Sequence, residues 1–201
     1  MNEDTVTRRA AIGAALFLAG LVLVSTMTWR VPPAAAEEFC WTGSGTQFVD
    51  AISYCASSVL APQGGSTYEP KNLTDGNPAT AWCEGAPRDG VGETLTIRID
   101  GGPPFRRLLI SNGYGKSSQI YANNGRIKTL EITSDAGTQT TAPLIDQNGL
   151  LPVYLPTPAQ HWVQLKIVDV YPGDRFADTC LADVTPDYEY EEELLQREPG
   201  R

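Results

Sequence analysis

Histidine and basic residues are scarce in this sequence, and each scarcity excludes a class of function. The 201 residues include one histidine, His161. A nucleophilic triad therefore lacks an expected base, and a cysteine–histidine zinc site lacks partners. The 15 Lys and Arg residues are outnumbered by 24 Asp and Glu, which gives a net charge of −9. Binding of nucleic acid requires clustered cations, so we expect no nucleic-acid partner.

A long apolar run is also missing. The uncharged stretch 10–24 follows Arg8 and Arg9 and is shorter than the roughly 20 residues of a membrane-spanning helix. Small residues follow at 34–36, so the order predicts a signal segment over residues 1–36 that is cleaved after Ala36. The arginine pair resembles a twin-arginine signal, with ordinary secretory export as the alternative. We expect a periplasmic or secreted protein, attached to a membrane only if the segment stays uncleaved.

Cysteine is rare but even in number, with Cys40, Cys55, Cys83 and Cys180 and no C-x-x-C spacing. In an exported chain this pattern predicts two disulfides. Three pairings are possible, and the sequence alone does not choose among them. We favour Cys40–Cys55, which would close a short loop over residues 37–56, together with Cys83–Cys180, which would join two loops beside the candidate site.

The remaining sequence is typical of β-structure with dense turns. Apolar and polar residues alternate at 95–99, 129–132 and 163–167, and a short apolar run occupies 107–110. Turn-forming Gly, Pro, Asn and Asp residues separate these segments, as in an all-β sandwich. We predict a sandwich over residues 57–186, a short helix around residues 47–54, and a disordered acidic tail over 187–201.

One turn has the composition of a cation site. Asp75, Asn77 and Thr80 offer oxygen ligands around a Gly-Asn-Pro turn, and calcium accepts such a flexible set of oxygens. The alternative is an Asx-stabilised turn that holds no metal. The residues of the turn alone leave both interpretations open.

Several segments together resemble a known family. Segment 75–82 (DGNPATAW) resembles the signature of the discoidin, or coagulation factor 5/8 type C, family of galactose-binding-like domains. More specifically, the chain resembles the bacterial NADase-type glycan-binding domains through segments 57–64, 82–85, 112–117, 124–128, 169–173 and 178–183. The resemblance covers about residues 56–184 and implies a jelly-roll β-sandwich.

The resemblance also implies a structural calcium ion (Ca2+). Its ligands would come from two backbone carbonyls and four side chains, at Asn72, Asp75, Asn77, Thr80, Ala182 and Asp183. Asp183 stands where the wider family often has Glu, a longer arm. The ion would fix the turn that carries Trp82 and tie it to the last strand.

Polar and aromatic residues in the predicted loops form the candidate ligand face. They combine aromatic plates with amides, carboxylates and cations, the mixture that sugars require: Trp82, Glu84, Asn112, Tyr114, Lys116, Tyr121, Asn124, Arg126, Tyr171 and Asp178. Structural alternatives exist for several of them. Trp82 could lie in the core, Arg126 and Glu84 could form an ion pair, and the asparagines could support their turns.

These observations favour an exported, non-catalytic glycan-binding module. Two other hypotheses stay open. One is an envelope subunit that binds another protein through the same loops. The other is a glycoside hydrolase that uses two carboxylates, for example Glu84 and Asp178, across a cleft.

Overall fold

The computed structural model describes residues 38–197. Within them lie ten strands, two α-helices and one 3-10 helix: β1 Phe39–Ser44, β2 Ala51–Ala56, η1 Pro70–Thr74, β3 Trp82–Cys83, β4 Thr94–Asp100, β5 Phe105–Asn112, α1 Ser118–Asn123, β6 Arg126–Ser134, β7 Gln139–Pro143, β8 Leu150–Ala159, β9 Trp162–Tyr171, β10 Cys180–Pro186 and α2 Tyr188–Arg197.

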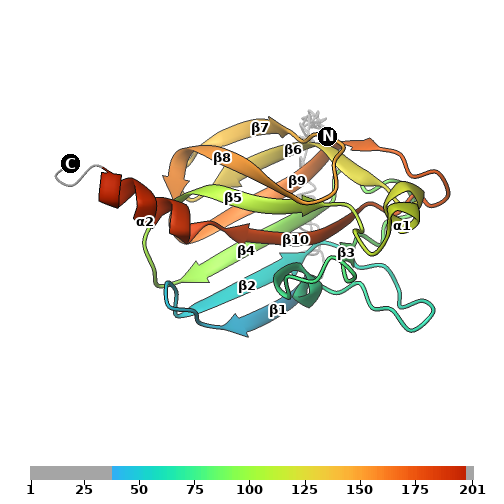
Figure 1. Cartoon of the computed structure of the whole chain (residues 1–201), viewed down its shortest axis with the longest axis horizontal. Helices are drawn as coiled ribbons and strands as arrows, with labels where there is room; N and C mark the ends of the chain where they lie inside the picture. The colour runs from blue at the N-terminus through green and yellow to red at the C-terminus, as the bar shows by residue number, and fades with distance from the viewer. Residues whose placement is uncertain (1–37, 198–201) are drawn as a thin grey trace, which may run out of the picture. The chain divides into compact units, whose positions relative to one another are not determined.

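The strands form two antiparallel sheets that face each other. The six-stranded sheet has the order β1-β2-β4-β9-β6-β7, and the four-stranded sheet has the order β3-β10-β5-β8. Figure 1 shows α1 and α2 at opposite ends of this sandwich. The prediction of an all-β, disulfide-stapled sandwich is confirmed.

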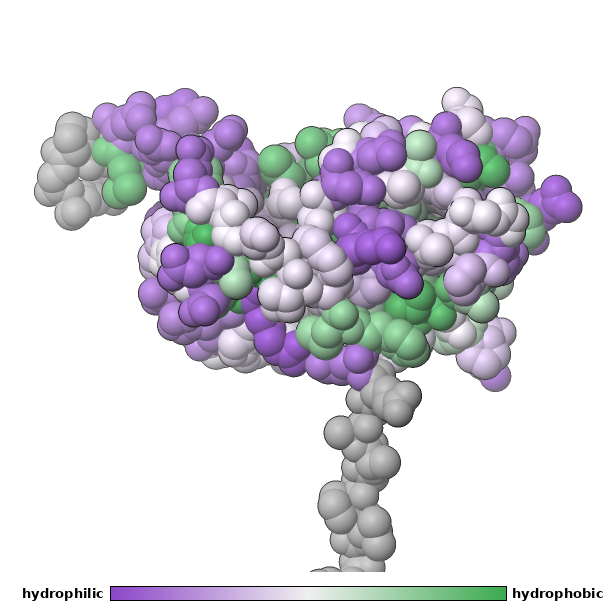
Figure 2. All heavy atoms as spheres, turned by 90° about the horizontal axis from the view of Figure 1, so that it is seen from below, coloured by the Kyte–Doolittle hydropathy of each residue, from purple (hydrophilic) through white to green (hydrophobic). Residues whose placement is uncertain are grey.

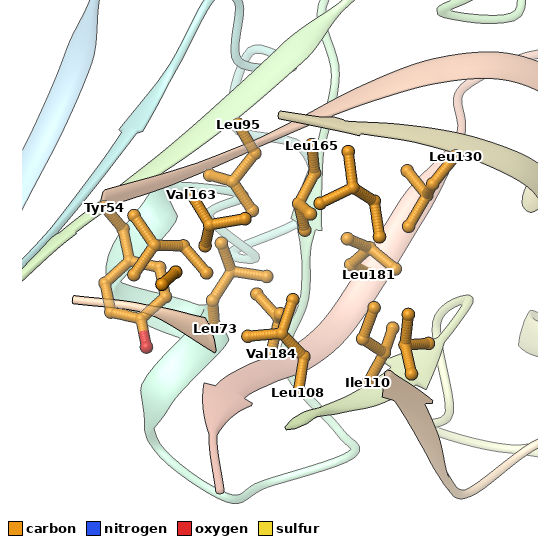
Figure 3. Packing of buried hydrophobic residues seen from close by; sticks show 14 of the residues in the cluster. Tyr54, Leu73, Leu95, Leu108, Ile110, Leu130, Val163, Leu165, Leu181 and Val184 are labelled. Atoms are coloured by element: carbon orange, nitrogen blue, oxygen red, sulfur yellow. The ribbon is translucent and has the colours of Figure 1, made fainter. Parts of the chain in front are cut away.

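The core lies between the two sheets. In β9, Val163, Leu165 and Ile167 are buried while Lys166 is exposed, as the alternating sequence predicts. Figure 3 shows the side chains of the six-stranded sheet meeting Leu181 and Val184 of β10. Burial of this apolar surface supplies the main favourable contribution to folding.

The N-terminal segment differs from the prediction. Residues 47–54 form no helix; β1 and β2 make a hairpin that joins the large sheet. The spacing of apolar residues in this short segment also fits a strand, because Tyr54 and Ala56 face the core when β2 pairs with β4. Pairing satisfies the backbone groups of β2 on both sides, which a short isolated helix does not achieve.

The sequence predicted segments of β4, β5, β6 and β9 but not the other six strands, and β8 shows why. It contains Pro152, Pro156 and Pro158, which argue against a strand because proline donates no backbone hydrogen bond. The strand tolerates them because it forms an edge of the four-stranded sheet.

The two favoured disulfides are both present. Cys40 lies opposite Cys55 in the β1–β2 pair, and Cys83 lies opposite Cys180 in the β3–β10 pair. Each bond links neighbouring strands. The second spans 97 residues of sequence and fixes the short strand β3 to β10.

The prediction of a disordered acidic tail over 187–201 is wrong for residues 188–197, and its last four residues lie outside the described residues. Residues 188–197 form α2, whose start is capped by Asp187: its carboxylate accepts from the Tyr190 backbone N–H at 3.1 Å. The same carboxylate accepts from Arg107 Nε at 2.7 Å, and Glu191 accepts from the Arg106 backbone N–H at 2.8 Å. Two of the tail's acids therefore fix the helix, while Figure 2 shows its outer surface as predominantly hydrophilic.

The predicted signal segment, residues 1–36, lies outside the described residues. Among residues 38–197, no helix has both the length and the apolar character required to span a membrane.

Candidate functional site

Most of the predicted ligand residues lie at one end of the sandwich. We call this the loop end: loops 84–93, 112–125, 144–149 and 172–179, at the end that carries α1 (Figure 1). Backbone hydrogen bonds join the loops, from Gly113 N to Cys180 O at 3.0 Å and from Gly125 N to Asp178 O at 2.9 Å. The structure thus brings distant segments of sequence together, as expected.

Arg126 is a buried clamp within the loop end. Its Nε and one terminal nitrogen donate to the two oxygens of Asp146 at 3.1 and 2.7 Å. Its other terminal nitrogen donates to the Asn124 and Pro172 carbonyls at 2.8 and 2.9 Å. The hydrogen bonds from Arg126 lower the pKa of Asp146. The considered ion pair between Arg126 and Glu84 is therefore wrong, because Asp146 takes that place.

Tyr121 completes this cluster. Its hydroxyl donates to Asp146 Oδ1 at 2.9 Å, and its ring lies 5.4 Å from the Arg126 guanidinium carbon. Burial and the hydrogen bond to Asp146 raise the pKa of Tyr121 to about 12. Asp146 was not predicted from the sequence. Its neighbours in the sequence give no sign that it pairs with Arg126, which lies twenty positions earlier.

Glu84 is fully buried and supports the backbone. Its two carboxylate oxygens accept from the Thr179 N–H at 3.0 Å and from the Ala86 N–H at 2.7 Å. Burial raises the pKa of Glu84 to about 6, and burial also raises the pKa of Asp178. A Cβ on Gly90 would come within 2.5 Å of the Glu84 side chain, so the loop closes directly over this carboxylate.

The two asparagines support the backbone as well. Asn112 donates to the Ile127 carbonyl at 2.7 Å and accepts from the Ile127 N–H at 2.9 Å, which extends the strand pairing through a side chain. Asn124 donates to the Ile120 carbonyl at 2.8 Å at the end of α1. Both side chains are buried, and these bonds use their amide groups.

The aromatic residues of the loop end are mostly covered. Trp82 is 1% exposed, lies in the core and donates from Nε1 to the Ser58 carbonyl at 3.0 Å, so it offers no exposed plate. Tyr114 is 6% exposed and meets Tyr68 edge to face at 6.2 Å. Tyr171 donates to the Leu144 carbonyl at 3.0 Å. Lys116 is exposed to solvent.

The turn at residues 72–80, the candidate calcium turn, is closed by its own side chains. Asp75 accepts from the Asn77 N–H at 2.8 Å and from the Thr80 hydroxyl at 2.7 Å. Asp183 of β10 accepts from the Gly76 N–H at 3.2 Å, so the turn and the last strand meet as expected. The Asn72 side chain is used elsewhere and donates to the Thr67 and Ala81 carbonyls at 2.7 and 2.9 Å.

The donor set of this turn fits a hard cation. Burial and the nearby charge of Asp75 raise the pKa of Asp183 to about 6. Among the described residues, no basic side chain forms an ion pair with either carboxylate. Two facing carboxylates without a cation, beside amide and hydroxyl oxygens, are the ligand chemistry that calcium accepts. The Asn72 and Ala182 backbone carbonyls would add the same kind of ligand.

A surface cavity of about 440 Å³ lies beside this turn. Its polar side chains come from β5, β10 and the β7–β8 loop: Ser111, Asn148, Asp183 and Thr185. Apart from Asp183, these residues were not predicted. Ser111 and Thr185 can be recognised as neighbours only from the pairing of β5 with β10, which places both on one face of the sheet.

The fold is an antiparallel β-sandwich that carries the loop end at one of its two ends. The family model for the NAD glycohydrolase translocation F5/8 type C domain matches residues 45–187. The chain belongs to this family, and the resemblance found in the sequence is confirmed.

Two solved structures illustrate the shared fold. The chain is similar to a CBM32 module from Clostridium perfringens in complex with GalNAc-β-1,3-galactose, with 18% identity, a TM-score of 0.50, and coverage of 66% of this chain and 92% of that chain. It is also similar to part of the arabinofuranosyltransferase AftD from Mycobacteria, with 18% identity, a TM-score of 0.51, and coverage of 79% of this chain and 12% of that chain. A search of curated proteins gives no significant match.

Proposed function

We propose that this protein is an exported, non-catalytic glycan-binding module stabilised by a calcium ion. Membership of the F5/8 type C family, together with a carbohydrate-binding-module-like fold, carries the proposal. The similar Clostridium perfringens module is a complex with a disaccharide. At such low identity the likeness concerns the fold alone, so the ligand itself is the hypothesis to test.

The environment of Glu84 supports a non-catalytic role. A carboxylate pair that cleaves a glycosidic bond must reach the bond from both sides. Both oxygens of Glu84 already accept backbone N–H groups, and the side chain is fully buried. Glu84 and Asp178 therefore act as structural carboxylates in this proposal.

The calcium ion would be held by Asp75, Asn77, Thr80 and Asp183 together with the Asn72 and Ala182 carbonyls. When bound, it would neutralise the two facing carboxylates and fix the turn to β10. We expect added calcium to raise the melting temperature of the protein. At a calcium concentration one hundred times Kd, the free energy of unfolding should increase by about 2.7 kcal/mol. Asp75→Asn should lose most of this increase, whereas Asp174→Asn, an exposed acid at the loop end, should keep it. Equal melting temperatures in calcium and in chelator would remove the metal from the proposal.

Export predicts a shortened protein outside the cytoplasm. Mass spectrometry of the protein recovered from the envelope and culture medium should show Glu37 as the first residue. A protein that retains residues 1–36 in the membrane fraction would indicate a tether instead.

A broad glycan array tests binding itself. The disulfide-bonded protein, in calcium, should bind a restricted set of glycans. If the folded protein binds none, the glycan proposal fails and the envelope protein-binding hypothesis takes its place.

A further inference from the structure

The outer face of the four-stranded sheet carries an ordered row of side chains. Asp183 of β10 lies opposite Ser111 of β5, and Ser111 lies opposite Leu150 of β8. Two residues further along, Thr185 lies opposite Leu109, and Leu109 opposite Pro152. Directly opposite residues share a face, so these two rows point outward together while the intervening Ile110 and Val184 point into the core.

Two cavities meet on this face. The cavity of about 440 Å³ described above includes Ser111, Asp183 and Thr185. A second cavity, of about 620 Å³, includes Leu109, Thr185 and Asp187 and reaches Glu189 of α2. Thr185 lines both cavities, and we call the two neighbouring cavities together the β10 groove; the second also extends to the β1–β2 hairpin, where Phe48 and Val49 line it.

Polar groups in the first cavity are available to a ligand. Of its four polar side chains, only Asp183 is hydrogen-bonded within residues 38–197, through Gly76 N. Ser111, which is 6% exposed, Thr185 and Asn148 make no side-chain hydrogen bond with another described residue. Arg126, Glu84 and Asn112 at the loop end differ, because their polar groups already bind the backbone or Asp146.

Apolar surface lies beside these polar groups. Leu150 is 59% exposed at the rim of the first cavity. In the next row along β5 and β8, Arg107 lies opposite Tyr154, which is 54% exposed. The Arg107 guanidinium carbon lies 3.8 Å from the centre of the Tyr190 ring, and the rings of Tyr154 and Tyr190 meet edge to face at 5.9 Å. Sugars combine hydroxyls with C–H faces, so they match a mixed surface of this kind.

The charges in the groove select the kind of sugar. Asp183, Asp187 and Glu189 line it, and the nearby Arg107 already pairs with Asp187. Calcium would neutralise Asp183, and Arg107 pairs with Asp187, so Glu189 is the charge that would repel a carboxylated or sulfated sugar. From Asp183 in the first cavity to Asp187 in the second, the groove follows four residues of the chain, about 13 Å at roughly 3.3 Å per residue. A single sugar ring is shorter than this distance.

We infer that the β10 groove binds a neutral oligosaccharide along the outer face of the four-stranded sheet and loop 144–149, rather than at the ligand residues predicted from the sequence. The inference rests on the proposed function and adds to it a location, a charge class and a minimum length. Thr185, Asn148 and Ser111 would donate to and accept from sugar hydroxyls, and Leu150 would pack against a sugar ring.

Calorimetric titration of the full disulfide-bonded protein tests the inference. The probes are GalNAc-β-1,3-galactose, longer neutral oligosaccharides that bind on the array, and a sialylated counterpart of each. Thr185→Val keeps the shape of the side chain and removes its hydroxyl, and Asn148→Ala removes the amide. Each should weaken binding of the neutral glycan about three- to tenfold, which is the effect of one lost hydrogen bond. Asp183 is left unchanged, because its loss would also disturb the calcium turn.

Matched variants separate the possible outcomes. Thr133→Val makes the same change on β6 of the other sheet and should bind like the wild type. Lys116→Ala changes the exposed cation of the loop end and should also leave affinity unchanged. If the wild type binds a glycan but the groove variants bind it equally well, or if the sialylated probes bind better, the inference is overturned while the glycan function stands. If the folded wild type binds no glycan at all, both fail.

Discussion

The loop end and the β10 groove contain similar side chains and use them differently. In the loop end, Arg126 and Glu84 are buried, and the hydrogen bonds they make hold loops together. In the groove, Ser111 and Thr185 lie on a rigid sheet that needs no help from their hydroxyls. The buried polar residues of the loop end therefore satisfy the backbone of the loops, as buried polar groups generally must.

The largest effect should come from the disulfide that anchors the loop end. Replacing Cys83 and Cys180 by Ala should lower the free energy of unfolding by up to about 4.7 kcal/mol, since the bond closes a loop of nearly one hundred residues. Replacing Cys40 and Cys55, which close a much shorter loop, should lower it by about 3 kcal/mol. Chemical denaturation of both double variants measures the difference. A larger loss for the N-terminal pair would contradict this ranking.

Arg126→Ala should give the next largest loss, about 2–4 kcal/mol. The change leaves the Asn124 and Pro172 carbonyls without donors and removes a charge-assisted pair with Asp146. Urea unfolding measures it, with Lys116→Ala as the control that should leave stability unchanged. Equal stability of both variants would show that the hydrogen bonds of Arg126 do not stabilise the loop end.

Asp187→Ala tests the opposite end of the sandwich, where α2 docks. It removes a helix cap and the partner of Arg107, so we expect a loss of about 2–3 kcal/mol and faster proteolysis after residue 187. Glu189→Ala, a neighbouring exposed acid, is the control. Retained stability together with unchanged proteolysis would favour the disordered tail expected from the acidic sequence.

The smallest effect concerns pH and Glu84. Because burial raises the pKa of this carboxyl from 4.5 to about 6, the folded protein holds its proton more tightly than the unfolded chain. Its contribution to stability is therefore complete below about pH 4.5 and is lost as pH rises to about 6. Unfolding of the wild type and of Glu84→Gln should be compared at pH 4.5 and pH 7, in calcium. The wild type should lose more stability over this range, and parallel changes would show that Glu84 does not titrate as expected.

Sequence reasoning predicted the sandwich and the paired cysteines because both rest on local signals: alternating strands and an even number of thiols in an exported chain. It failed for α2, because the pairing of Asp187 with Arg107 joins residues eighty positions apart. The same limit applies to Arg126 and Asp146. The β10 groove could not be predicted from the sequence either, because Ser111, Thr185 and Leu150 become neighbours only through strand register.

Amide chemical-shift mapping during titration with the best-binding neutral oligosaccharide tests the central claim most directly. The account predicts that the perturbed amides cluster on β5, β8 and β10 around Ser111, Leu150 and Thr185. Perturbations confined to residues 112–126 and 172–178 would contradict it and return the binding site to the loop end.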